Sequence, residues 1–327
     1  MYSVDQLQKL IEDEIVRRSD EMLKNSPVEL YQPILYSLEM GGKRLRPALV
    51  LIACNLFSEN VEQALPAAVA IEVFHNFTLL HDDIMDKASV RRNRPTVHMK
   101  FNENSAILSG DAMAFQSYKY LVECSSPRLV DVVSLFTKTA IEVCEGQQLD
   151  MDFESRMDVR TDEYLEMIRL KTAVLLAASL KAGALIGNAD DETSARLYDF
   201  GIQLGLAFQL QDDLLDTFGD QDTFGKKIGG DILANKKTYL LIKALENARP
   251  EQKSVLLDWI VKEDCDPEQK ISEVTRIYRE TGAKELTEKK VDSCFVQAME
   301  ILSKLQVAEE RKSELRELAN KMLTRKK

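Results

Sequence analysis

Apolar residues recur at helical spacing, every three or four positions, through most of the chain. Clear runs are Val69, Val73, Leu80 and Ile84, then Leu165, Ile168 and Leu175, then Ile202, Leu206, Leu210 and Leu214. Residues at this spacing share one face of an α-helix, so each run predicts a helix with a buried face. The alternation of apolar and polar residues that marks a half-buried strand is nearly absent. The chain is therefore predicted to be all-α.

Short segments rich in Gly, Pro, Asn or Asp interrupt these runs. They are "MGGKRLRP", "RRNRPTVH", "CSSPR", "GNADDE", "FGDQDTFGKKIGGD" and "ARPEQK". Such residues favour turns and disfavour helix interiors. The segments between the breaks predict about ten or more helices in one bundle, with charged loops at one end. Because no linker, repeat or composition shift divides the chain, we predict a single domain over residues 1–327.

Composition excludes several classes of protein. The formal net charge of -11 argues against a nucleic-acid-binding surface, which needs a basic face. The N-terminus is acidic and periodic, so it predicts a helix and not a signal peptide. The most apolar stretch, "TAVLLAASLKAGALIGNA", is interrupted by Lys181, whereas a membrane span needs about 20 mostly apolar residues, so a buried helix is predicted.

The cysteines give no sign of a disulfide framework or a metal site. They are odd in number, scattered and without metal-ligand spacing, and we interpret them as reduced core thiols. The five are Cys54, Cys124, Cys144, Cys265 and Cys294. Reduced thiols suit a cytoplasmic protein.

Three aspartates end the helical run predicted over residues 65–85. On a helix Asp82 and Asp86 lie roughly 40° apart, His75 falls between them two turns earlier, and Asp83 points further round. Carboxylates at i and i+4 repel unless a cation lies between them, and their oxygens suit Mg²⁺ carried in by phosphate. Alone, such a pair is more often solvated charge or helix capping.

The same spacing occurs again in "QLQDDLLD", at Asp212, Asp213 and Asp216. It again follows an apolar run and precedes a glycine-rich loop with lysines, and two matched occurrences favour a function. Gly201 and Gly205 project to the same helix face. They form either a wall along which an apolar tail slides or a place of close helix packing.

Basic residues cluster where these motifs end, although the chain is acidic. In "GGKRLRP", a flexible Gly-Gly turn lets Lys43, Arg44 and Arg46 converge on an anion, and no nucleotide P-loop pattern is present. Further basic positions, together with Thr172, are Arg91, Arg92, Lys171, Lys226, Lys227, Lys236 and Lys237. Each alone is better explained as a solvated face. Together they predict one diphosphate held on Mg²⁺ with lysine support and another on a metal-free cluster of Lys43, Arg46 and Arg92.

A series of segments between about Leu38 and Leu241 resembles the trans-isoprenyl diphosphate synthases in order and spacing. They are "GGKRLRP", "LLHDDIMDKASVRRNRPTVH", "GDAM", "GQQLD", "LKTA", "FQLQDDLLD", "GDQDTFGKKIGGDI" and "NKKTYL". The resemblance implies a homodimer of the isoprenoid synthase fold, with helices around a central cavity. It implies head-to-tail condensation of isopentenyl diphosphate with an allylic diphosphate, which about three Mg²⁺ ions bridge to both aspartate motifs.

The resemblance also implies roles for individual residues. The metal ligands would be Asp82, Asp86 and Asp212, with Asp83 and Asp216 supporting them or acting through water. The allylic diphosphate would contact Arg91, Lys171, Gln209, Lys226 and Lys236, and Thr172 would help to stabilise the cation. Isopentenyl diphosphate would be held by Gly42, Lys43, Arg46, His75 and Arg92. No side-chain base stands out, so the released diphosphate is the expected proton acceptor.

Product length depends on the residues one and two turns before Asp82, which are Phe74, Phe77 and Thr78. An aromatic residue fifth before the first aspartate resembles the short-chain enzymes that make the twenty-carbon product. An ideal helix turns Phe77 about 140° from Asp82, which leaves Phe74 and Thr78 nearer the pocket. Phe115 is an alternative floor, and ordinary core packing is the alternative for all the aromatics. The small Thr78 favours geranylgeranyl over farnesyl diphosphate.

Other functions stay open at this point. A longer-chain synthase would share these motifs. A terpene cyclase needs no second, metal-free diphosphate cluster, and a non-catalytic helical partner subunit typically loses one aspartate motif, whereas both are intact here. The last quarter of the chain, from about Pro250, carries no chemical constellation and is predicted only to complete the bundle.

Overall fold

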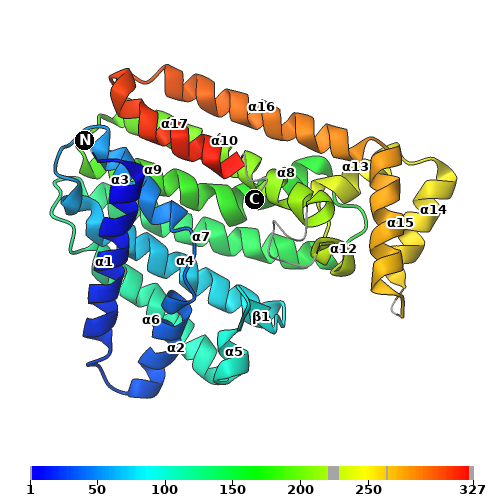
Figure 1. The fold of residues 1–327 in the computed structure, drawn as a ribbon, viewed down its shortest axis with the longest axis horizontal. Helices are drawn as coiled ribbons and strands as arrows, with labels where there is room; N and C mark the ends of the chain where they lie inside the picture. The colour runs from blue at the N-terminus through cyan, green and yellow to red at the C-terminus, as the bar shows by residue number, and fades with distance from the viewer. Residues whose placement is uncertain (1, 220–227, 263, 324–327) are drawn as a thin grey trace. The chain divides into compact units, whose positions relative to one another are not determined.

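The structure is a computed structural model and describes residues 2–219, 228–262 and 264–323. Apart from one short hairpin, the regular elements of these residues are helices, which confirms the all-α prediction (Figure 1). The chain divides into two units. Unit 1 comprises Met1–Thr137, Ala178–Ala195 and Gln306–Leu315, and unit 2 comprises Lys138–Ala177, Arg196–Leu305 and Arg316–Lys327.

Unit 1 is organised around α4 (Leu65–Met85), whose limits agree with those predicted. Ala67 through Phe74 are all buried, and α4 lies beside α6 in Figure 1. The other elements are α1 (Val4–Met22), α2 (Val28–Glu39), α3 (Leu45–Asn55), the 3-10 helix η1 (Val61–Ala64), α5 (Val97–Lys100) and α6 (Glu103–Leu121). The antiparallel strands β1 (Val90–Arg91) and β2 (Arg94–Pro95) connect α4 to α5.

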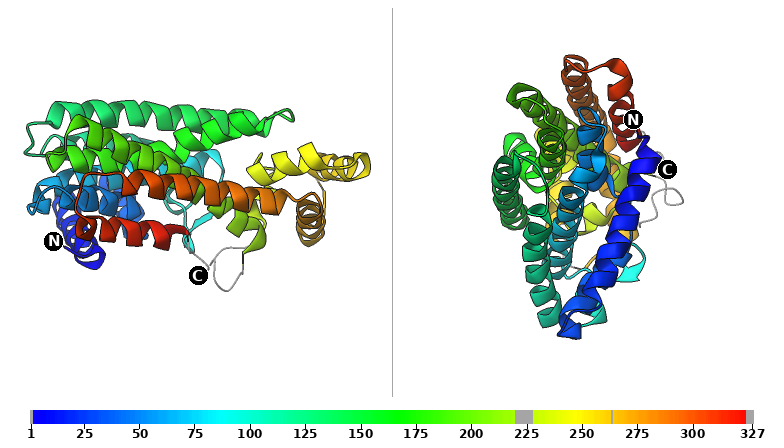
Figure 2. Two further views of the ribbon diagram at one scale, coloured as in Figure 1. Left: turned by 90° about the horizontal axis from the view of Figure 1, so that it is seen from above. Right: turned by 90° about the vertical axis from the view of Figure 1, so that its left-hand side faces the viewer.

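Unit 2 packs its helices around an apolar core that includes Leu210, Leu240, Leu256 and Ile277. Its elements are α8 (Thr161–Ile168), the π-helical turn η2 (Arg169–Ala173), α12 (Gly230–Leu233), α13 (Tyr239–Asn247), α14 (Pro250–Val261), α15 (Pro267–Glu280) and α16 (Ala283–Ser303). Figure 2 shows α16 as one uninterrupted helix, and α14 and α15 pack against each other.

Four helices contribute turns to both units. They are α7 (Leu129–Glu154), α9 (Val174–Ile186), α10 (Asp191–Phe218) and α17 (Glu309–Leu323). Almost every residue of α9 is buried, which confirms the predicted buried apolar helix. Within the described residues, no helix combines the length and the apolar character needed to cross a membrane.

The structure settles the interpretation of the two glycines on α10. A Cβ atom on Gly201 would lie 2.5 Å from Cα of Ala177, and one on Gly205 would lie 2.5 Å from Cα of Ala173. No side chain fits at that distance. The glycine strip is therefore a place of close helix packing, and the alternative of an open wall for an apolar tail is wrong.

The prediction that all five cysteines are core thiols is partly wrong. Cys54, Cys124 and Cys294 are buried, but Cys144 is exposed and Cys265 is partly exposed. Cys144 lies on a turn of α7 whose neighbour Val143 takes the buried position. All five are free thiols.

Candidate active site

The residues predicted to hold isopentenyl diphosphate come together in unit 1. Gly42, in the turn after α2, has a φ of +138°, and a Cβ atom there would lie 2.8 Å from the Arg92 guanidinium. Only glycine allows the backbone and this arginine to approach so closely. Arg46, in the first turn of α3, brings Nη1 to 3.2 Å from Nε2 of His75 on α4. Lys43 is exposed in the same turn as Gly42.

His75 is a neutral ring among positive charges. Its pKa lies well below 6.5 because the ring is removed from water and because Arg46, Arg92 and further arginines disfavour a second charge. A neutral imidazole has one nitrogen that accepts a hydrogen bond, so Nε2 can accept from Arg46. Several guanidinium groups around a neutral ring favour the binding of an anion.

Arg44 differs from its neighbours in sequence. Its guanidinium forms an ion pair with the buried carboxylate of Glu72 and donates to the carbonyl oxygen of Leu38 at 2.7 Å. Asn76 donates to the same carboxylate at 3.0 Å. The expectation that Arg44 converges on an anion is therefore corrected, because this side chain fixes the glycine turn against α4.

The β1–β2 hairpin, which the sequence did not predict, directs two arginines to different places. Arg92 and Asn93 at its tip have φ values of 53° and 60°, as in the two-residue turns whose twist suits paired strands. Arg92 lies against Gly42. Arg91, one residue earlier, donates through Nε to both carboxylate oxygens of Asp83 at 2.8 Å.

The first aspartate motif lies at the C-terminal end of α4, where the helix dipole disfavours negative charge. Asp82 and Asp86 share one face, as their spacing predicts. Asp83, predicted to support the metal ligands or to act through water, is only 3% exposed and pairs with Arg91. Burial raises the pKa of Asp83, while Arg91 opposes this shift. Arg91 also reaches Asp82, with Nη2 3.5 Å from Oδ2.

The second aspartate motif, on α10 in unit 2, has its own buried aspartate. Asp213 is 3% exposed and accepts hydrogen bonds from the Tyr164 hydroxyl and, at 3.1 Å, from Nε2 of Gln209. Burial raises the pKa of the Asp213 carboxyl, and the nearby Asp231 carboxylate raises it further. Tyr164 was not predicted, because its hydrogen bond to Asp213 joins two helices that are distant in the sequence.

The outer aspartates of the second motif are partly exposed. Asp216 accepts a hydrogen bond from the backbone N–H of Asp231 at 2.9 Å, so the start of α12 orients its carboxylate. Asp212 lies one turn earlier on the same helix face. The two motifs therefore have the same arrangement. In each, the middle aspartate is buried against a partner of its own unit, and the outer two aspartates are more accessible to solvent.

Lys171 and Thr172 lie in the π-helical turn η2. Such turns are rare and occur frequently at functional sites. Nζ of Lys171 is 2.6 Å from Oδ2 of Asp150, and the Thr172 hydroxyl donates to Oε1 of Gln209 at 3.0 Å. Gly146 on α7 gives the wide turn its space, because a Cβ atom there would lie 2.3 Å from the Lys171 backbone nitrogen. The segment "GQQLD", which carries Gly146 and Asp150, was the available signal.

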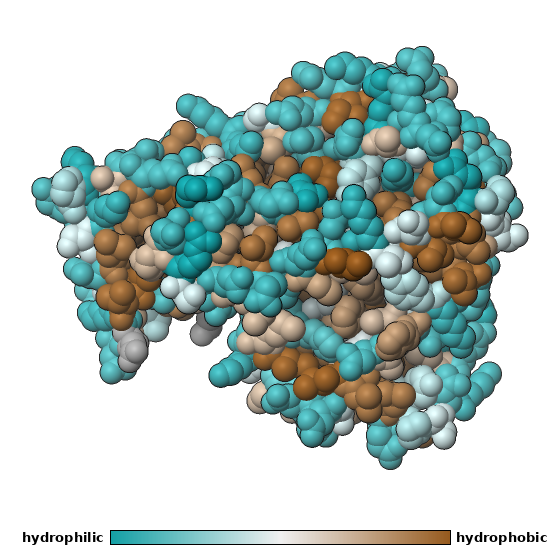
Figure 3. All heavy atoms as spheres, turned by 180° about the vertical axis from the view of Figure 1, so that it is seen from behind, coloured by the Kyte–Doolittle hydropathy of each residue, from teal (hydrophilic) through white to brown (hydrophobic). Residues whose placement is uncertain are grey.

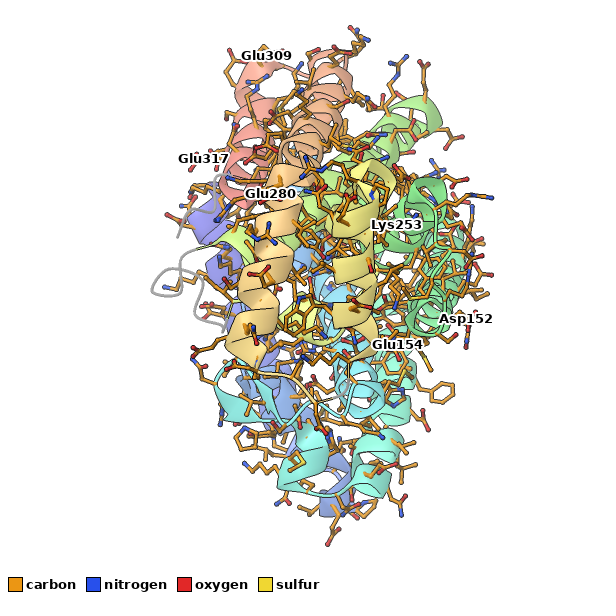
Figure 4. The ribbon with its side chains drawn as sticks, turned by 90° about the vertical axis from the view of Figure 1, so that its right-hand side faces the viewer. Asp152, Glu154, Lys253, Glu280, Glu309 and Glu317 are labelled. Atoms are coloured by element: carbon orange, nitrogen blue, oxygen red, sulfur yellow. The ribbon has the colours of Figure 1, made fainter. Side chains whose placement is uncertain are left out.

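Four lysines follow the second motif. Lys226 and Lys227 lie outside the described residues. Lys236 is in the turn between α12 and α13, where its backbone N–H donates to the Asp231 carbonyl at 3.0 Å. Its neighbour Lys237 is buried and donates through Nζ to the carbonyl oxygen of Glu154, in the last turn of α7 (Figure 4).

The candidate chain-length residues form part of an aromatic cluster in unit 1. Phe74 is buried, with its ring centroid 5.4 Å from that of Phe77 and 5.1 Å from that of Phe136. Tyr118 contacts Phe136 in turn, with centroids 5.0 Å apart. Thr78 donates its hydroxyl hydrogen to a backbone carbonyl of its own helix. Phe136 and Tyr118 were not predicted from the sequence.

Phe115, the alternative floor on another helix, has a different place. Its side chain is 76% exposed, so it is not packed under α4 of its own chain, and that alternative is corrected. Phe77 packs against His81, with centroids 4.8 Å apart. Phe74 is thus the candidate that is buried deepest among the aromatics that precede Asp82.

The carboxylates of the two aspartate motifs suit a metal ion that is already bound to other ligands when it enters the site. Among the described residues, no group of three or more His, Cys, Asp or Glu side chains is placed to hold an ion by itself. Each outer aspartate pair offers two carboxylates, and Mg²⁺ usually completes its six ligands with water and phosphate oxygens. The donor set therefore suits Mg²⁺ bound to a diphosphate.

An all-α fold with two such motifs and a separate arginine cluster defines a prenyltransferase that uses diphosphate substrates. The comparisons identify the family: the chain matches polyprenyl synthetase over residues 27–279 and belongs to that family. It is 40% identical over 323 residues to the geranylgeranyl diphosphate synthase of Methanosarcina mazei, covering 96% of this chain and 97% of that protein. It is also 40% identical over 266 residues to the geranylfarnesyl diphosphate synthase of Natronomonas pharaonis, covering 75% and 78%.

Solved structures confirm the fold. A crystal structure of a geranylgeranyl pyrophosphate synthase matches with a TM-score of 0.93 at 40% identity, covering 100% of both chains. A geranylgeranyl pyrophosphate synthase from Corynebacterium glutamicum, complexed with isoprenyl diphosphate and magnesium, matches with a TM-score of 0.88 at 28% identity, covering 99% of this chain and 100% of that one.

Proposed function

We propose that this protein is a Mg²⁺-dependent synthase that condenses isopentenyl diphosphate head-to-tail with an allylic diphosphate and makes all-trans geranylgeranyl diphosphate. The observation that carries the proposal is the presence of two kinds of anion site. The outer aspartate pairs suit a metal-bound diphosphate, whereas the arginines around neutral His75 suit a diphosphate without metal.

Both aspartate motifs act on the allylic diphosphate. Asp82, Asp86, Asp212 and Asp216 would hold the Mg²⁺ ions, about three by family resemblance, and bound Mg²⁺ would supply charge stabilisation for the departing diphosphate. Asp83, predicted from the resemblance to support the metal, acts through Arg91, which it holds in place. Asp213 holds Gln209 in the same way. The buried members of the two motifs thus orient residues that contact the substrate.

The remaining allylic contacts come from basic and polar side chains. Arg91, Lys171, Gln209 and Lys236 contact the diphosphate, and Lys226 is predicted to do the same. Thr172 directs its hydroxyl hydrogen to Gln209, which leaves its oxygen lone pairs free to stabilise a nearby cation. Fixed dipoles of this kind stabilise developing charge in a water-excluded site.

Isopentenyl diphosphate is held by Gly42, Lys43, Arg46, His75 and Arg92. The allylic C–O bond breaks, the bonding electrons leave with the diphosphate, and the double bond of isopentenyl diphosphate attacks the cation to form one C–C bond. A proton then passes to the released diphosphate. Because both substrates are fixed before bond breaking, positioning supplies much of the rate enhancement.

The buried aromatic cluster sets the product length. Phe74, supported by Phe136 and Tyr118, is the floor below Asp82, and Phe77 and Thr78 border it. A floor two turns below the first aspartate supports the twenty-carbon product. The 40% identity to a geranylfarnesyl diphosphate synthase favours a twenty-five-carbon product as the second candidate.

The protein is proposed to act as a homodimer. Large apolar side chains are exposed on or next to α6 and at the start of α7: Ile107, Leu108, Phe115, Val122 and Val130. Figure 3 shows that hydrophobic residues lie among hydrophilic ones on the face that it displays. Apolar patches of this kind mark association surfaces, so a second copy is the proposed partner. The single domain over residues 1–327 and the cytoplasmic location stay predictions.

Release of diphosphate tests the reaction. With Mg²⁺, the full chain is expected to release diphosphate only when isopentenyl diphosphate and an allylic diphosphate are both present, and EDTA is expected to abolish release. Steady release from the allylic diphosphate alone would indicate a cyclase instead. No release with any substrate would indicate a non-catalytic partner subunit.

A further inference from the structure

Lys270 on α15 is a buried lysine in the part of the chain that was predicted only to complete the bundle. Lys270 is only 3% exposed, and its Nζ atom donates a hydrogen bond to Oδ1 of Asn235 at 2.7 Å. Burying an ammonium group is costly unless it is well hydrogen-bonded. A lysine in this position therefore points to a specific task for the Asn235 contact.

Asn235 is held from two sides in the turn between α12 and α13. Its φ of 54° places it in the left-handed region, where asparagine is tolerated better than most residues. Lys270 binds its side chain, and buried Lys237 donates to its carbonyl oxygen at 3.1 Å. Lys236 lies between Asn235 and Lys237 in the sequence. With Lys270 and Tyr278, it lines a small cavity with room for about one water molecule.

Ile271, the next residue on α15, lies close to Gly229 at the N-terminal end of α12. Gly229 has a φ of +85°, and a Cβ atom there would lie 2.6 Å from the side chain of Ile271. The Gly229 N–H donates to the carbonyl oxygen of Asp216 at 2.7 Å, and the Asp231 N–H donates to the carboxylate of Asp216 at 2.9 Å. Helix α15 is thus connected through both ends of α12 to the second aspartate motif.

We propose that Lys270 is a positioning residue for the allylic diphosphate. Through Asn235 it holds the α12–α13 turn so that Lys236 and Asp216 keep the geometry that binds the metal-bound diphosphate, and Lys270 itself touches no substrate. The inference rests on the proposed function. The residues assigned to isopentenyl diphosphate belong to unit 1, so a defect at Lys270 is expected to affect one substrate and not the other.

Kinetics of the full chain test this selectivity. Lys270→Met leaves Asn235 without its donor and is expected to raise the KM for the allylic diphosphate about tenfold, because an unsatisfied buried acceptor costs roughly one factor of ten or more. The KM for isopentenyl diphosphate is expected to change less than about twofold, and Lys270→Arg is expected to recover most of the loss. Lys253→Met, exposed on α14 (Figure 4), is the matched control and is expected to behave as the wild type.

A double-mutant cycle tests whether Lys270 acts through Asn235. Asn235→Gly removes the acceptor and keeps a residue that tolerates positive φ, so it also serves if Lys270→Met does not fold. The effects of Lys270→Met and Asn235→Gly are expected to be strongly non-additive. Additive effects, or an equal rise in both KM values, would overturn the inference.

Binding of inorganic diphosphate with Mg²⁺, measured by calorimetry, separates this inference from the proposed function. Weaker binding to Lys270→Met than to the wild type supports the positioning role even if the wild type makes no prenyl product. Equal affinity of the two proteins contradicts the role even if the wild type is an active synthase.

Discussion

At the scale of single residues, each aspartate motif combines partly exposed carboxylates with a buried one. Asp82 and Asp212 are partly exposed, whereas Asp83 and Asp213 are buried and bound to neighbours. We therefore propose different tasks for these adjacent residues of one type. Helix geometry alone predicted that Asp83 points away from Asp82 and Asp86, but it could not show that Arg91 would be its partner.

Substitution of adjacent aspartates is expected to separate these tasks. Asp82→Asn should lower kcat by roughly 100-fold or more, since metal-assisted charge stabilisation supplies several kcal/mol, and should change the unfolding free energy little. Asp83→Asn should lower the unfolding free energy by about 1–3 kcal/mol, because Arg91 loses a charged acceptor. Turnover assays and urea unfolding measure the two quantities. Near-normal turnover of Asp82→Asn would contradict the metal assignment.

The pKa of His75 predicts how stability depends on pH. In the folded protein this pKa lies well below the ordinary 6.5, so the unfolded chain takes up a proton first as the pH falls. Proton uptake by the unfolded chain lowers the unfolding free energy. The contribution of His75 is therefore a loss of stability that begins as the pH falls through about 6.5. At pH 5.5 the loss from this residue is on the order of 1 kcal/mol. His75→Gln, which cannot titrate, should show a correspondingly smaller drop in unfolding free energy between pH 7.5 and pH 5.5. An equal drop in both proteins would show that His75 is not held neutral.

At the scale of elements, the strongest patterns in the sequence were the most predictive. The limits of α4 and the break at "MGGKRLRP" follow from apolar periodicity and from glycines, which are local signals. The β1–β2 hairpin has no alternating pattern, because two-residue strands are too short for one. The π-helical turn η2 depends on the close approach of Gly146, which no local signal reveals. The same holds for Lys270, whose partner is 35 residues away.

The close approach of α7 to η2 gives a prediction about that element. Gly146→Ala places a methyl group 2.3 Å from the Lys171 backbone, so the π-helical turn must shift, and kcat is expected to fall at least tenfold. The matched control is Gly201→Ala, which crowds Ala177 on α9. It should lower the thermal unfolding midpoint while kcat of the folded fraction stays nearly unchanged. Equal effects of the two variants on kcat would contradict a special role for η2.

At the scale of the whole molecule, the exposed apolar side chains of α6 predict association. Phe115→Glu puts a charge on the aromatic residue of the set, which is 76% exposed. Burial of this unpaired charge in a dimer interface would be costly. Light scattering should find the wild type as a dimer and the variant shifted toward monomer. Lys253→Glu on α14 adds the same carboxylate to an exposed residue of unit 2 that is not part of this set, and this variant should remain dimeric. A wild-type monomer at micromolar concentration would contradict the proposed homodimer.

The mass of the product is the most direct test of the proposed synthase and of its product length. The full chain is incubated with Mg²⁺, isopentenyl diphosphate and each of three allylic primers in turn, and the products are identified by mass spectrometry. For a synthase with Phe74 as its floor, we expect one dominant twenty-carbon diphosphate from primers that are shorter than this product. A dominant product of fifteen carbons, or of twenty-five or more, would contradict the Phe74 floor, and no elongation of any primer would contradict the synthase itself.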